Sequence, residues 1–177
     1  MHRFWLEKAG IEADYRACHV LPEDLAAYVE QRRADPDWRG CNVTLPHKIA
    51  VMDLVEDPGN VRASIGAMNT IARDDQGDLF GTNTDAGGFY GPIADLPLAG
   101  APVVVVGTGG AAHAVLFALS RVGAGPVTLL ARNPLKGAAL LARFGLKGDV
   151  RPIESAIPPA QLLVNTTSLG MVGQPAF

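Results

Sequence analysis

A run of four valines, Val103–Val106, leads directly into Gly107-Thr108-Gly109-Gly110-Ala111. A short run of β-branched apolar residues is typical of a strand buried on both faces of a parallel sheet. The spacing Gly107-x-Gly109-x-x-Ala112 matches the alanine form of the dinucleotide fingerprint, in which small residues allow a tight turn, close approach of a pyrophosphate and close helix packing. The segment therefore predicts a nucleotide-binding strand, turn and helix. The alternative is a glycine-rich turn that binds nothing.

The sequence after this turn continues to alternate between helix and strand. We expect a helix over residues 111–122, a strand at Val127–Ala131, a helix over residues 134–144 and a strand at Leu162–Asn165. Short apolar strands separated by helices of this length predict an α/β fold with a parallel, Rossmann-type sheet.

The N-terminal half has a different pattern. It predicts a helix over residues 2–9, a strand over 15–20, a helix over 22–33, a strand over 39–43, a helix that begins at Pro46 and carries Ile49, Met52 and Val55, and a hairpin with strands over 67–73 and 78–82. The pattern of expected helices and strands changes near Asp85, so we expect two domains, residues 1–84 and 85–177.

The composition limits the classes of partner. Of the 177 residues, 48% are hydrophobic and 19% charged, which is typical of a globular protein and too apolar for a disordered one. The net charge of -3 gives no electrostatic argument for nucleic acid or an anionic membrane. Cys18 and Cys41 lack metal-ligand spacing and are interpreted as reduced, buried cysteines. Because the sequence also shows no signal-peptide pattern, the cytoplasm is the expected location.

The end of the second expected strand, Ala131-Arg132-Asn133-Pro134, bears on the choice of dinucleotide. NAD sites usually place a carboxylate there to accept from the adenosine ribose hydroxyls. This chain has no acid at that place, and Lys136 follows closely. Because an arginine can stack on adenine and neutralise a 2′-phosphate, the sequence favours NADP. The alternative is an arginine that lies in solvent near a helix start. His113 is interpreted as a surface or packing residue.

Lys48 ends the segment Asn42-Val43-Thr44-Leu45-Pro46-His47-Lys48, at a predicted turn from strand to helix. Polar side chains can converge at such a turn. Oxidation of a secondary alcohol requires a base for the hydroxyl proton and the reverse reaction requires an acid, and a lysine can serve as either. Burial favours the neutral amine and a nearby carboxylate favours the ammonium, and the sequence leaves both open. The alternative is a solvated lysine on a helix face.

Asp85 ends the segment Gly81-Thr82-Asn83-Thr84-Asp85. An aspartate here can simply cap a helix. The small residues Ala86 and Gly87 that follow leave room for a ligand, which capping does not require. Asn69 opens an expected strand, and it is either a site residue or a turn asparagine that bonds its own backbone.

Taken together, these segments resemble the shikimate dehydrogenase family. Its members share an N-V-T-x-P-x-K segment, a G-A-x-N-T segment, a G-x-N-T-D-x-x-G-F segment, a G-x-G-G-A turn and an N-T/A-T/S-x-x-G-M segment. This chain has the counterparts in the same order, at residues 42–48, 66–70, 81–89, 107–111 and 165–171. The resemblance covers nearly the whole chain.

The resemblance implies an NADPH-dependent enzyme that reversibly reduces 3-dehydroshikimate to shikimate in aromatic amino acid biosynthesis. It implies that Lys48 is the catalytic acid and base, and that Asp85 orients the reacting hydroxyl. Thr44 and Asn69, together with Asp85, would bind the substrate. The residues implied to contact the cofactor are Gly107, Thr108, Gly109, Gly110, Ala111, Ala131, Arg132, Asn133, Lys136, Asn165, Thr166, Thr167, Ser168 and Met171. We expect a monomer or a homodimer.

The chain departs from the family pattern at both ends. The family begins with a strand and a Ser-x-Ser-Pro segment that holds the substrate carboxylate, whereas this chain starts at Met1. The family also continues to a glutamine-bearing helix, whereas this chain stops at Phe177. We therefore expect a partial chain with weak or absent activity as it stands. Asn133 stands where the family often has threonine, so we expect an altered phosphate site.

Three other interpretations stay open. The first is a quinate/shikimate dehydrogenase with broader substrate or NAD use, against which Arg132 counts. The second is a non-catalytic module that senses NADP(H). The third is a folate-type dehydrogenase, and the Asn83-Thr84-Asp85 segment ahead of the glycine turn counts against it.

Overall fold

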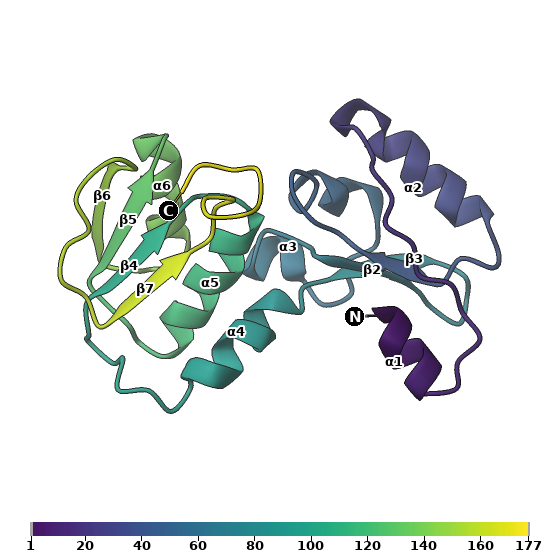
Figure 1. Ribbon diagram of the computed structural model, residues 1–177, viewed down its shortest axis with the longest axis horizontal. Coiled ribbons are helices and arrows are strands. Elements are labelled where there is room, and N and C mark those ends of the chain that lie inside the picture. Colours follow the sequence, from purple (N-terminus) through teal and green to yellow (C-terminus); the bar gives the residue numbers. More distant parts are fainter. Residues whose placement is uncertain (1, 177) are drawn as a thin grey trace.

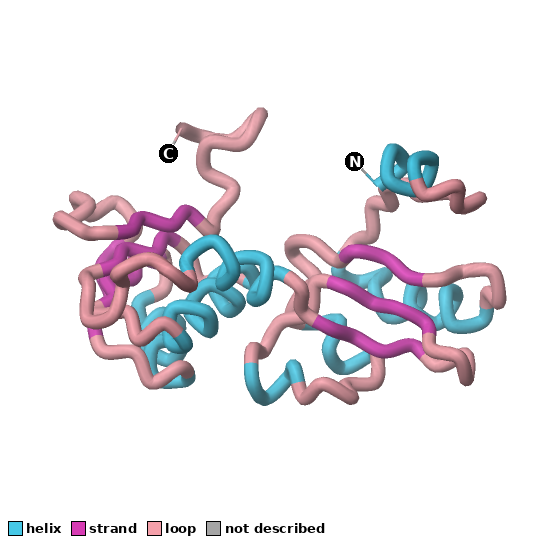
Figure 2. Tube along the Cα trace, turned by 90° about the horizontal axis from the view of Figure 1, so that it is seen from below, coloured by secondary structure: helices cyan, strands magenta, loops and turns pink. Residues whose placement is uncertain are grey.

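The chain folds around two separate β-sheets (Figures 1 and 2). The computed structural model describes residues 2–176. The antiparallel sheet contains β1 (Gly40–Asn42), β2 (Thr70–Arg73) and β3 (Leu79–Thr82), in that order. The parallel sheet contains β4 (Val103–Val106), β5 (Val127–Ala131), β6 (Gly148–Pro152) and β7 (Leu162–Asn165), in the order β6-β5-β4-β7. None of the described helices is long and apolar enough to cross a membrane.

The valine run forms a central strand of the parallel sheet, as predicted. All four residues of β4 are at most 2% exposed. Val106 lies opposite Leu130 of β5 on one side and Asn165 of β7 on the other. Because the three strands are parallel, their C-terminal ends meet at one edge of the sheet. The predicted helices are present as α5 (Gly110–Arg121) and α6 (Pro134–Arg143).

The edge strand β6 is not indicated by the sequence. It pairs with β5 through Gly148 opposite Val127, and among its residues only Val150 is half-buried. An edge strand lacks the continuous apolar run of a central parallel strand, so β6 has no pattern that distinguishes it from a loop.

The antiparallel sheet contains the predicted hairpin. Ile71 of β2 lies opposite Gly81 of β3, and Cys41 of β1 lies opposite Ile71 on the other side. Helix α2 (Leu25–Ala34), which follows the 3-10 turn η1 (Pro22–Asp24), contributes Leu25 and Val29 to the core of this half. The predicted N-terminal helix is present as α1 (His2–Lys8), and none of its residues is buried.

The predicted strand over residues 15–20 is wrong. The segment forms no backbone ladder with the described strands and is held instead by polar contacts. The Tyr15 hydroxyl donates to Asn42 Oδ1 at 2.7 Å, and His47 Nε2 lies 2.8 Å from the carbonyl oxygen of Val20. The weak alternation of apolar residues leaves no face to bury against a sheet.

The cysteine prediction is only partly confirmed. Both thiols are free, and Cys41 is half-buried, but Cys18 is exposed. Cys18 lies in the segment that was expected to be a strand, so its predicted burial fails with that strand. Burial raises the pKa of the Cys41 thiol to about 11.

The helix predicted to begin at Pro46 is also wrong in type. Residues 45–49 form turns, and η2 (Ala50–Leu54) is a 3-10 helix. The carbonyl oxygen of Lys48 accepts from Met68 N at 2.7 Å, and Met52 N donates to Ile49 instead. In an α-helix, the carbonyl oxygen of Lys48 would accept from Met52 N, but here the tertiary hydrogen bond from Met68 N replaces that bond.

Helix α5 contributes to both hydrophobic cores. Ala114 belongs to the core that contains Val29 and Met68, whereas Leu116 and Leu119 belong to the core of the parallel sheet. Helices α4 (Asp85–Ile93) and α5 lie between the two sheets (Figure 1). One helix therefore fixes the two halves against each other.

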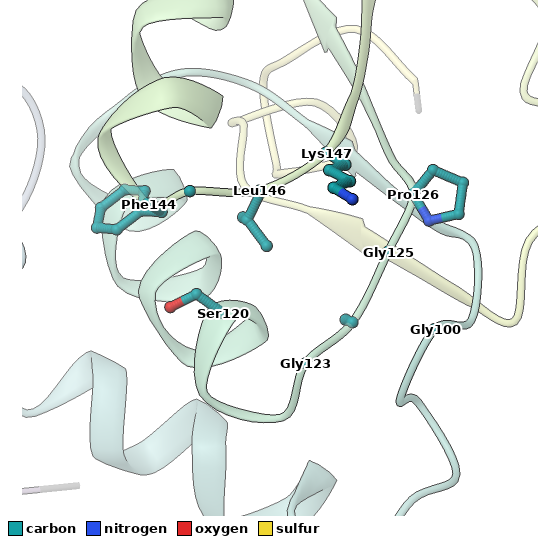
Figure 3. Close-up of a pocket in the computed structure, with 10 residues that line it drawn as sticks. Gly100, Ser120, Gly123, Gly125, Pro126, Phe144, Leu146 and Lys147 are labelled. Carbon is teal, nitrogen blue, oxygen red and sulfur yellow. The ribbon is translucent and has the colours of Figure 1, made fainter.

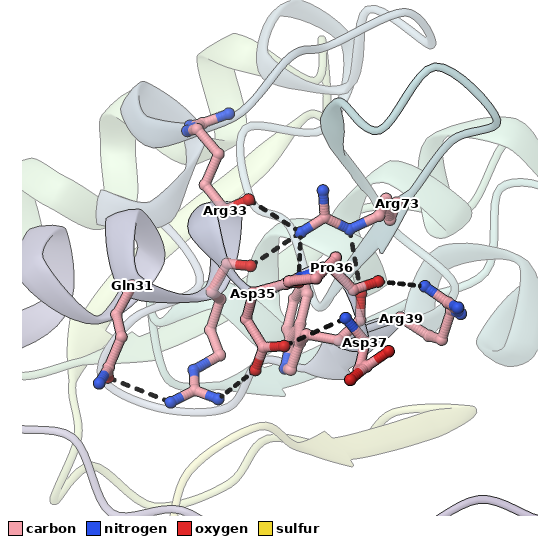
Figure 4. Close-up of polar contacts among 9 residues, drawn as sticks. Gln31, Arg33, Asp35, Pro36, Asp37, Arg39 and Arg73 are labelled. Atoms are coloured by element: carbon pink, nitrogen blue, oxygen red, sulfur yellow. Dashed lines mark hydrogen bonds and ion pairs between the residues drawn. The ribbon is translucent and has the colours of Figure 1, made fainter.

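Arg73 joins the C-terminal end of α2 to the antiparallel sheet (Figure 4). Its Nη2 donates to the carbonyl oxygens of Arg32 at 2.8 Å, Arg33 at 3.1 Å and Asp35 at 3.0 Å, and its Nε donates to that of Trp38 at 3.0 Å. The last carbonyls of a helix have no partner within the helix, and a planar guanidinium can satisfy several of them at once.

Replacement of Arg73 by lysine should lower the free energy of unfolding by about 2–4 kcal/mol, because one ammonium cannot reach four carbonyls. Arg39→Lys is a matched control, since exposed Arg39 makes a single hydrogen bond to the carbonyl oxygen of Pro36 at 2.7 Å. Its effect should stay within about 0.5 kcal/mol. Urea unfolding measures both variants. Equal losses of unfolding free energy would contradict a stabilising role for the hydrogen bonds of Arg73.

Candidate active site

Lys48 and Asp85 form an ion pair. Lys48 Nζ lies 2.6 Å from Asp85 Oδ2, and the two side chains are 16% and 35% exposed. Lys48 comes from the turn after β1, and Asp85 is the first residue of α4, so residues 37 positions apart in the chain meet here. The pair places an ammonium and a carboxylate together, half-screened from water.

Asn69 holds the second carboxylate oxygen. Its Nδ2 donates to Asp85 Oδ1 at 2.7 Å and to Thr84 Oγ1 at 2.9 Å, while its Oδ1 accepts from Thr84 N at 2.9 Å and from Thr70 Oγ1 at 3.0 Å. Asn69 is only 7% exposed. A buried amide with partners for both its oxygen and its nitrogen has little freedom to turn, so it orients the carboxylate of Asp85.

Asp85 does not cap its helix. Thr84 occupies the N-cap position, and Asn83 Oδ1 accepts from Ala86 N at 3.0 Å. Asn83 also donates from Nδ2 to the carbonyl oxygen of Ala67 at 2.7 Å. The carboxylate of Asp85 is therefore left for Lys48 and Asn69, at a helix end that favours negative charge. Asn83 and Thr84 are supporting residues that the sequence interpretation missed, although both lie within the Asn-Thr-Asp segment.

The side chain of Lys48 lies directly against the glycine turn of the parallel sheet. A Cβ atom at Gly110 would lie 2.7 Å from Lys48 Cβ and 3.0 Å from Lys48 Cδ. The first distance is shorter than real Cβ contacts and the second is tight, so glycine at this position allows the close approach of Lys48. Lys48 and Asp85 therefore stand beside the N-terminus of α5.

The glycine turn itself is open on one side. Gly107 has φ of 107°, and a Cβ atom there would lie 2.6 Å from Thr166 Oγ1. Among residues 2–176, a Cβ atom at Gly109 would meet nothing within 4 Å, and no side chain caps the N-terminus of α5. Thr108 and Ala111 are half-buried beside it. Uncapped amides at the start of a helix suit an anionic group.

The end of β5 lies at the same edge of the sheet. Ala131 is buried, whereas Arg132, Asn133 and Lys136 are exposed. Asn133 Oδ1 accepts from Lys136 N at 3.1 Å, so Asn133 caps α6. This leaves the two cationic side chains as the groups that can meet a phosphate.

The loop after β7 completes this edge. Thr166 Oγ1 donates to the carbonyl oxygen of Val106 at 2.6 Å, and Asn165 Oδ1 accepts from Thr167 N at 2.9 Å. These bonds fix the loop backbone against Gly107. Ser168 is half-buried and Met171 is 58% exposed.

Thr44 is exposed at the end of β1. Unlike Asn69, it has no place in the hydrogen-bonded network around Asp85. The structure therefore brings together Lys48, Asp85 and Asn69, and it leaves Thr44 at the margin of this group.

Two hollows in the surface lie away from these residues. One, of about 430 Å³, lies between Ser120, Pro126, Leu146 and Lys147, at the N-terminal edge of the parallel sheet (Figure 3). The other, of about 500 Å³, lies between α4 and α5. Neither is lined by Lys48, Asp85 or the glycine turn. Within residues 2–176, no group of three or more His, Cys, Asp or Glu side chains is placed to hold a metal ion.

Comparison with known proteins finds similarity to shikimate dehydrogenases. The family described as "Shikimate dehydrogenase substrate binding domain" matches residues 1–71. A curated protein of Sphingopyxis alaskensis, named "Shikimate dehydrogenase (NADP(+))", is 63% identical over 175 residues, which are 99% of this chain and 64% of that protein. The chain is thus similar to shikimate dehydrogenases over almost its whole length.

Solved structures show the same similarity. Shikimate 5-dehydrogenase of Thermus thermophilus, in complex with NADP(H) and shikimate, is 38% identical with a TM-score of 0.78, over 96% of this chain and 62% of that one. Shikimate dehydrogenase of Aquifex aeolicus is 32% identical with a TM-score of 0.84, over 99% and 65%. The predicted α/β fold with a Rossmann-type sheet is confirmed. The chain spans less than two thirds of the length of these relatives.

His113, in helix α5, is a buried titratable residue. It is 8% exposed, and its Nδ1 lies 2.9 Å from the carbonyl oxygen of Ile65. Burial lowers the pKa of the imidazole below its ordinary 6.5, and the charges of Arg143 and Lys136 act in the same direction, against the raising effect of the Ile65 contact. His113 is therefore a packing residue, one of the two roles that the sequence allowed for it.

Alanine at Gly110 should destabilise the protein, whereas alanine at Gly109 should not. The new Cβ at Gly110 would overlap Lys48, which should cost about 1–3 kcal/mol of unfolding free energy. Gly109 has an extended backbone that any residue adopts and open space beside it, so its alanine variant should change stability by less than about 1 kcal/mol. Thermal and urea unfolding of the two variants measure the difference, and the reverse order would refute the contact.

The stability of the protein should fall in acid partly through His113. Because the pKa is lower in the folded than in the unfolded chain, unfolding takes up a proton below pH 6.5, and stability decreases as the pH falls through the folded pKa. His113→Asn keeps a donor near Ile65 but does not titrate. The free energy of unfolding should therefore fall less between pH 7 and pH 5 in this variant than in the unaltered protein. Parallel curves would show that His113 does not contribute.

Proposed function

We propose that this chain is the catalytic and cofactor-binding part of an NADP-dependent shikimate dehydrogenase, which reversibly reduces 3-dehydroshikimate to shikimate. The observation that carries the proposal is the Lys48–Asp85 pair packed on Gly110, because it sets a proton donor beside the turn that would hold a dinucleotide. The names of the relatives support the same reaction.

The residues at the sheet edge fit NADP. The open space at Gly109 and the uncapped start of α5 suit a pyrophosphate. Arg132 and Lys136 are exposed at the end of β5, with no carboxylate among residues 131–136 to repel a 2′-phosphate. We propose that Gly107–Ala111 and the loop 165–171 contact the cofactor from two sides of the same edge.

The ion pair suits the reduction direction. NADPH, when bound, supplies a hydride for the carbonyl carbon of the substrate. Lys48, as the ammonium, gives a proton to the oxygen of that carbonyl, so that ketone, hydride and proton together make the secondary alcohol. In the reverse direction, Lys48 as the amine takes the hydroxyl proton. Asp85 holds Nζ in place in both directions and can accept a hydrogen bond from the hydroxyl.

Asn69 has a narrower role in this scheme than the sequence implied. Its amide already bonds Asp85, Thr84 and Thr70, and it is nearly buried. We propose that it acts on the substrate through Asp85. Thr44 is exposed just after the end of β1, and we propose that it contacts the substrate directly.

Two further parts of the proposal follow from the chain's organisation. Residues 1–84 would bind the substrate and residues 85–177 the cofactor, since Lys48 and Asn69 lie in the first range and the glycine turn in the second. A cytoplasmic location and a monomeric or homodimeric state stay predictions.

The proposed reaction can be measured directly on the protein with its natural ends. NADP⁺ reduction is followed at 340 nm with shikimate, beside parallel reactions with NAD⁺ and with quinate. Turnover of shikimate with NADP⁺ alone would support the proposal. Equal rates with quinate or NAD⁺ would indicate the broader quinate/shikimate dehydrogenase, and NADP⁺ binding without any turnover would indicate a sensor module.

Substitution of Lys48 by methionine should lower kcat by about 10²–10⁴-fold, because proton transfer loses its donor while the apolar stem against Gly110 is kept. Lys147→Met is the control, since exposed Lys147 lies at the opposite edge of the sheet. Steady-state rates with shikimate and NADP⁺ measure both, with circular dichroism to verify folding. Unchanged turnover in the Lys48 variant would remove it from the mechanism.

Arg132→Gln should raise the KM for NADP⁺ by about 10–100-fold, because one charge-assisted hydrogen bond to a phosphate is lost. The KM for NAD⁺, which lacks that phosphate, should stay the same. Arg151→Gln, an exposed arginine of β6 paired with Asp149, is the control. Equal changes for the two cofactors would place Arg132 away from the 2′-phosphate.

A further inference from the structure

Two side chains of the parallel-sheet half bind the end of a short helix in the other half. Helix α3 (Val61–Ser64) precedes Ile65 and Gly66. Arg143 Nη2, from the end of α6, donates to the carbonyl oxygens of Arg62 at 2.6 Å and Ala63 at 2.8 Å. His113 Nδ1, from α5, donates to that of Ile65 at 2.9 Å. These are carbonyls that a helix end leaves without internal partners.

The contact is tightly packed. Gly66 has φ of 79°, and a Cβ atom there would lie 2.8 Å from Arg143 Nη2 and 3.0 Å from His113 Nδ1. The His113 ring also meets the Phe144 ring edge to face, with centroids 6.3 Å apart. Side chains from α5 and α6 therefore contact the end of α3 and the two residues that follow it. We call the group Arg143, His113, Ile65 and Gly66 the α3 latch.

A five-residue segment connects this latch to the candidate active site. Residues 65–69 begin with the carbonyl that His113 binds and end with Asn69, whose amide holds Asp85 at 2.7 Å. Within the segment, Met68 N donates to the carbonyl oxygen of Lys48 at 2.7 Å. The segment therefore links the carbonyl of Ile65 by hydrogen bonds to both members of the ion pair.

Helix α5 places the latch and the lysine contact on one face. Gly110, His113, Ala114 and Phe117 are spaced at i, i+3, i+4 and i+7, which brings them to the same side of a helix. Gly110 receives Lys48, His113 receives Ile65, and Ala114 and Phe117 pack into the core of the antiparallel half. The distance along α5 between the two contacts is one turn.

We propose that His113 and Arg143 are positioning residues for catalysis, a role that rests on the proposed function. They hold residues 65–69, and with them Lys48 and Asp85, in register with the glycine turn. Proton and hydride transfer to one carbonyl require both groups within a fraction of an ångström of their proper places. The latch therefore governs kcat rather than the binding of either ligand.

The test compares His113→Leu and Arg143→Met with the conservative variants His113→Asn and Arg143→Lys, on the protein with its natural ends. Loss of the donor should lower kcat about 10–100-fold, with the KM values for shikimate and NADP⁺ changed less than about 3-fold. The conservative variants keep a donor and should recover most of the rate. Arg151→Met and His19→Leu, at exposed positions, are the controls and should leave kcat unchanged.

Two results would overturn the latch. A merely structural role predicts lower thermal stability with normal kcat at a temperature where the variant is folded. A cofactor-binding role predicts a raised KM for NADP⁺ with normal kcat.

Amide hydrogen exchange separates the latch from the reaction itself. Met68 N and Asn69 N, which donate to Lys48 and Thr82, should exchange about tenfold faster in His113→Leu and Arg143→Met than in the controls. If the unaltered protein turns over no shikimate, the proposed function fails and this exchange decides the latch alone. Unchanged exchange at both amides would disprove the latch, whatever the activity.

Discussion

The contact between Lys48 and Gly110 is the constraint on which the candidate site depends. The two halves of the chain have separate cores joined by helix α5, so the placement of one half against the other depends on α5 and on the few side chains that reach it. Lysine is long enough to reach α5, but it can lie flat there only because position 110 has no Cβ. The absence of a Cβ atom at Gly110 thus lets the aliphatic stem of Lys48 lie against the glycine turn.

A second dependence concerns the buried amide of Asn69. An aspartate beside a lysine is common on protein surfaces, where such pairs contribute little to stability. Here the carboxylate is oriented by an amide that is itself satisfied by Thr84 and Thr70, so its direction is set before any ligand arrives. Preorganised groups of this kind favour catalysis because they need no reordering during the reaction.

The parallel sheet and helix α5 divide two tasks between different surfaces of the same elements. The C-terminal edge of β4, β5 and β7 offers uncapped amides and exposed cationic side chains to a ligand. The side of α5 that carries Gly110, His113 and Ala114 meets the other half of the chain. A ligand at the helix end and a contact on the helix side therefore do not compete for space, and one rigid helix can align both.

The sequence by itself determined the elements with strong local signals. The valine run, the glycine turn, the hairpin and the long helices are confirmed, because continuous burial, positive φ and helical periodicity leave direct marks on residue type. It also determined which residues are candidates for the site, through the order of its short segments.

Only the tertiary structure decided where residues far apart in the chain meet. The segment around Lys48 forms turns and not the expected α-helix, because Met68 N donates to the carbonyl oxygen of Lys48. Cys18 lies outside any strand, and β6 forms at the edge of the sheet, where a strand can form without a continuous apolar run. His113 acquired its place through the carbonyl of Ile65, 48 residues away. Local propensity contains no term for such contacts, because their energy exists only once both cores have formed.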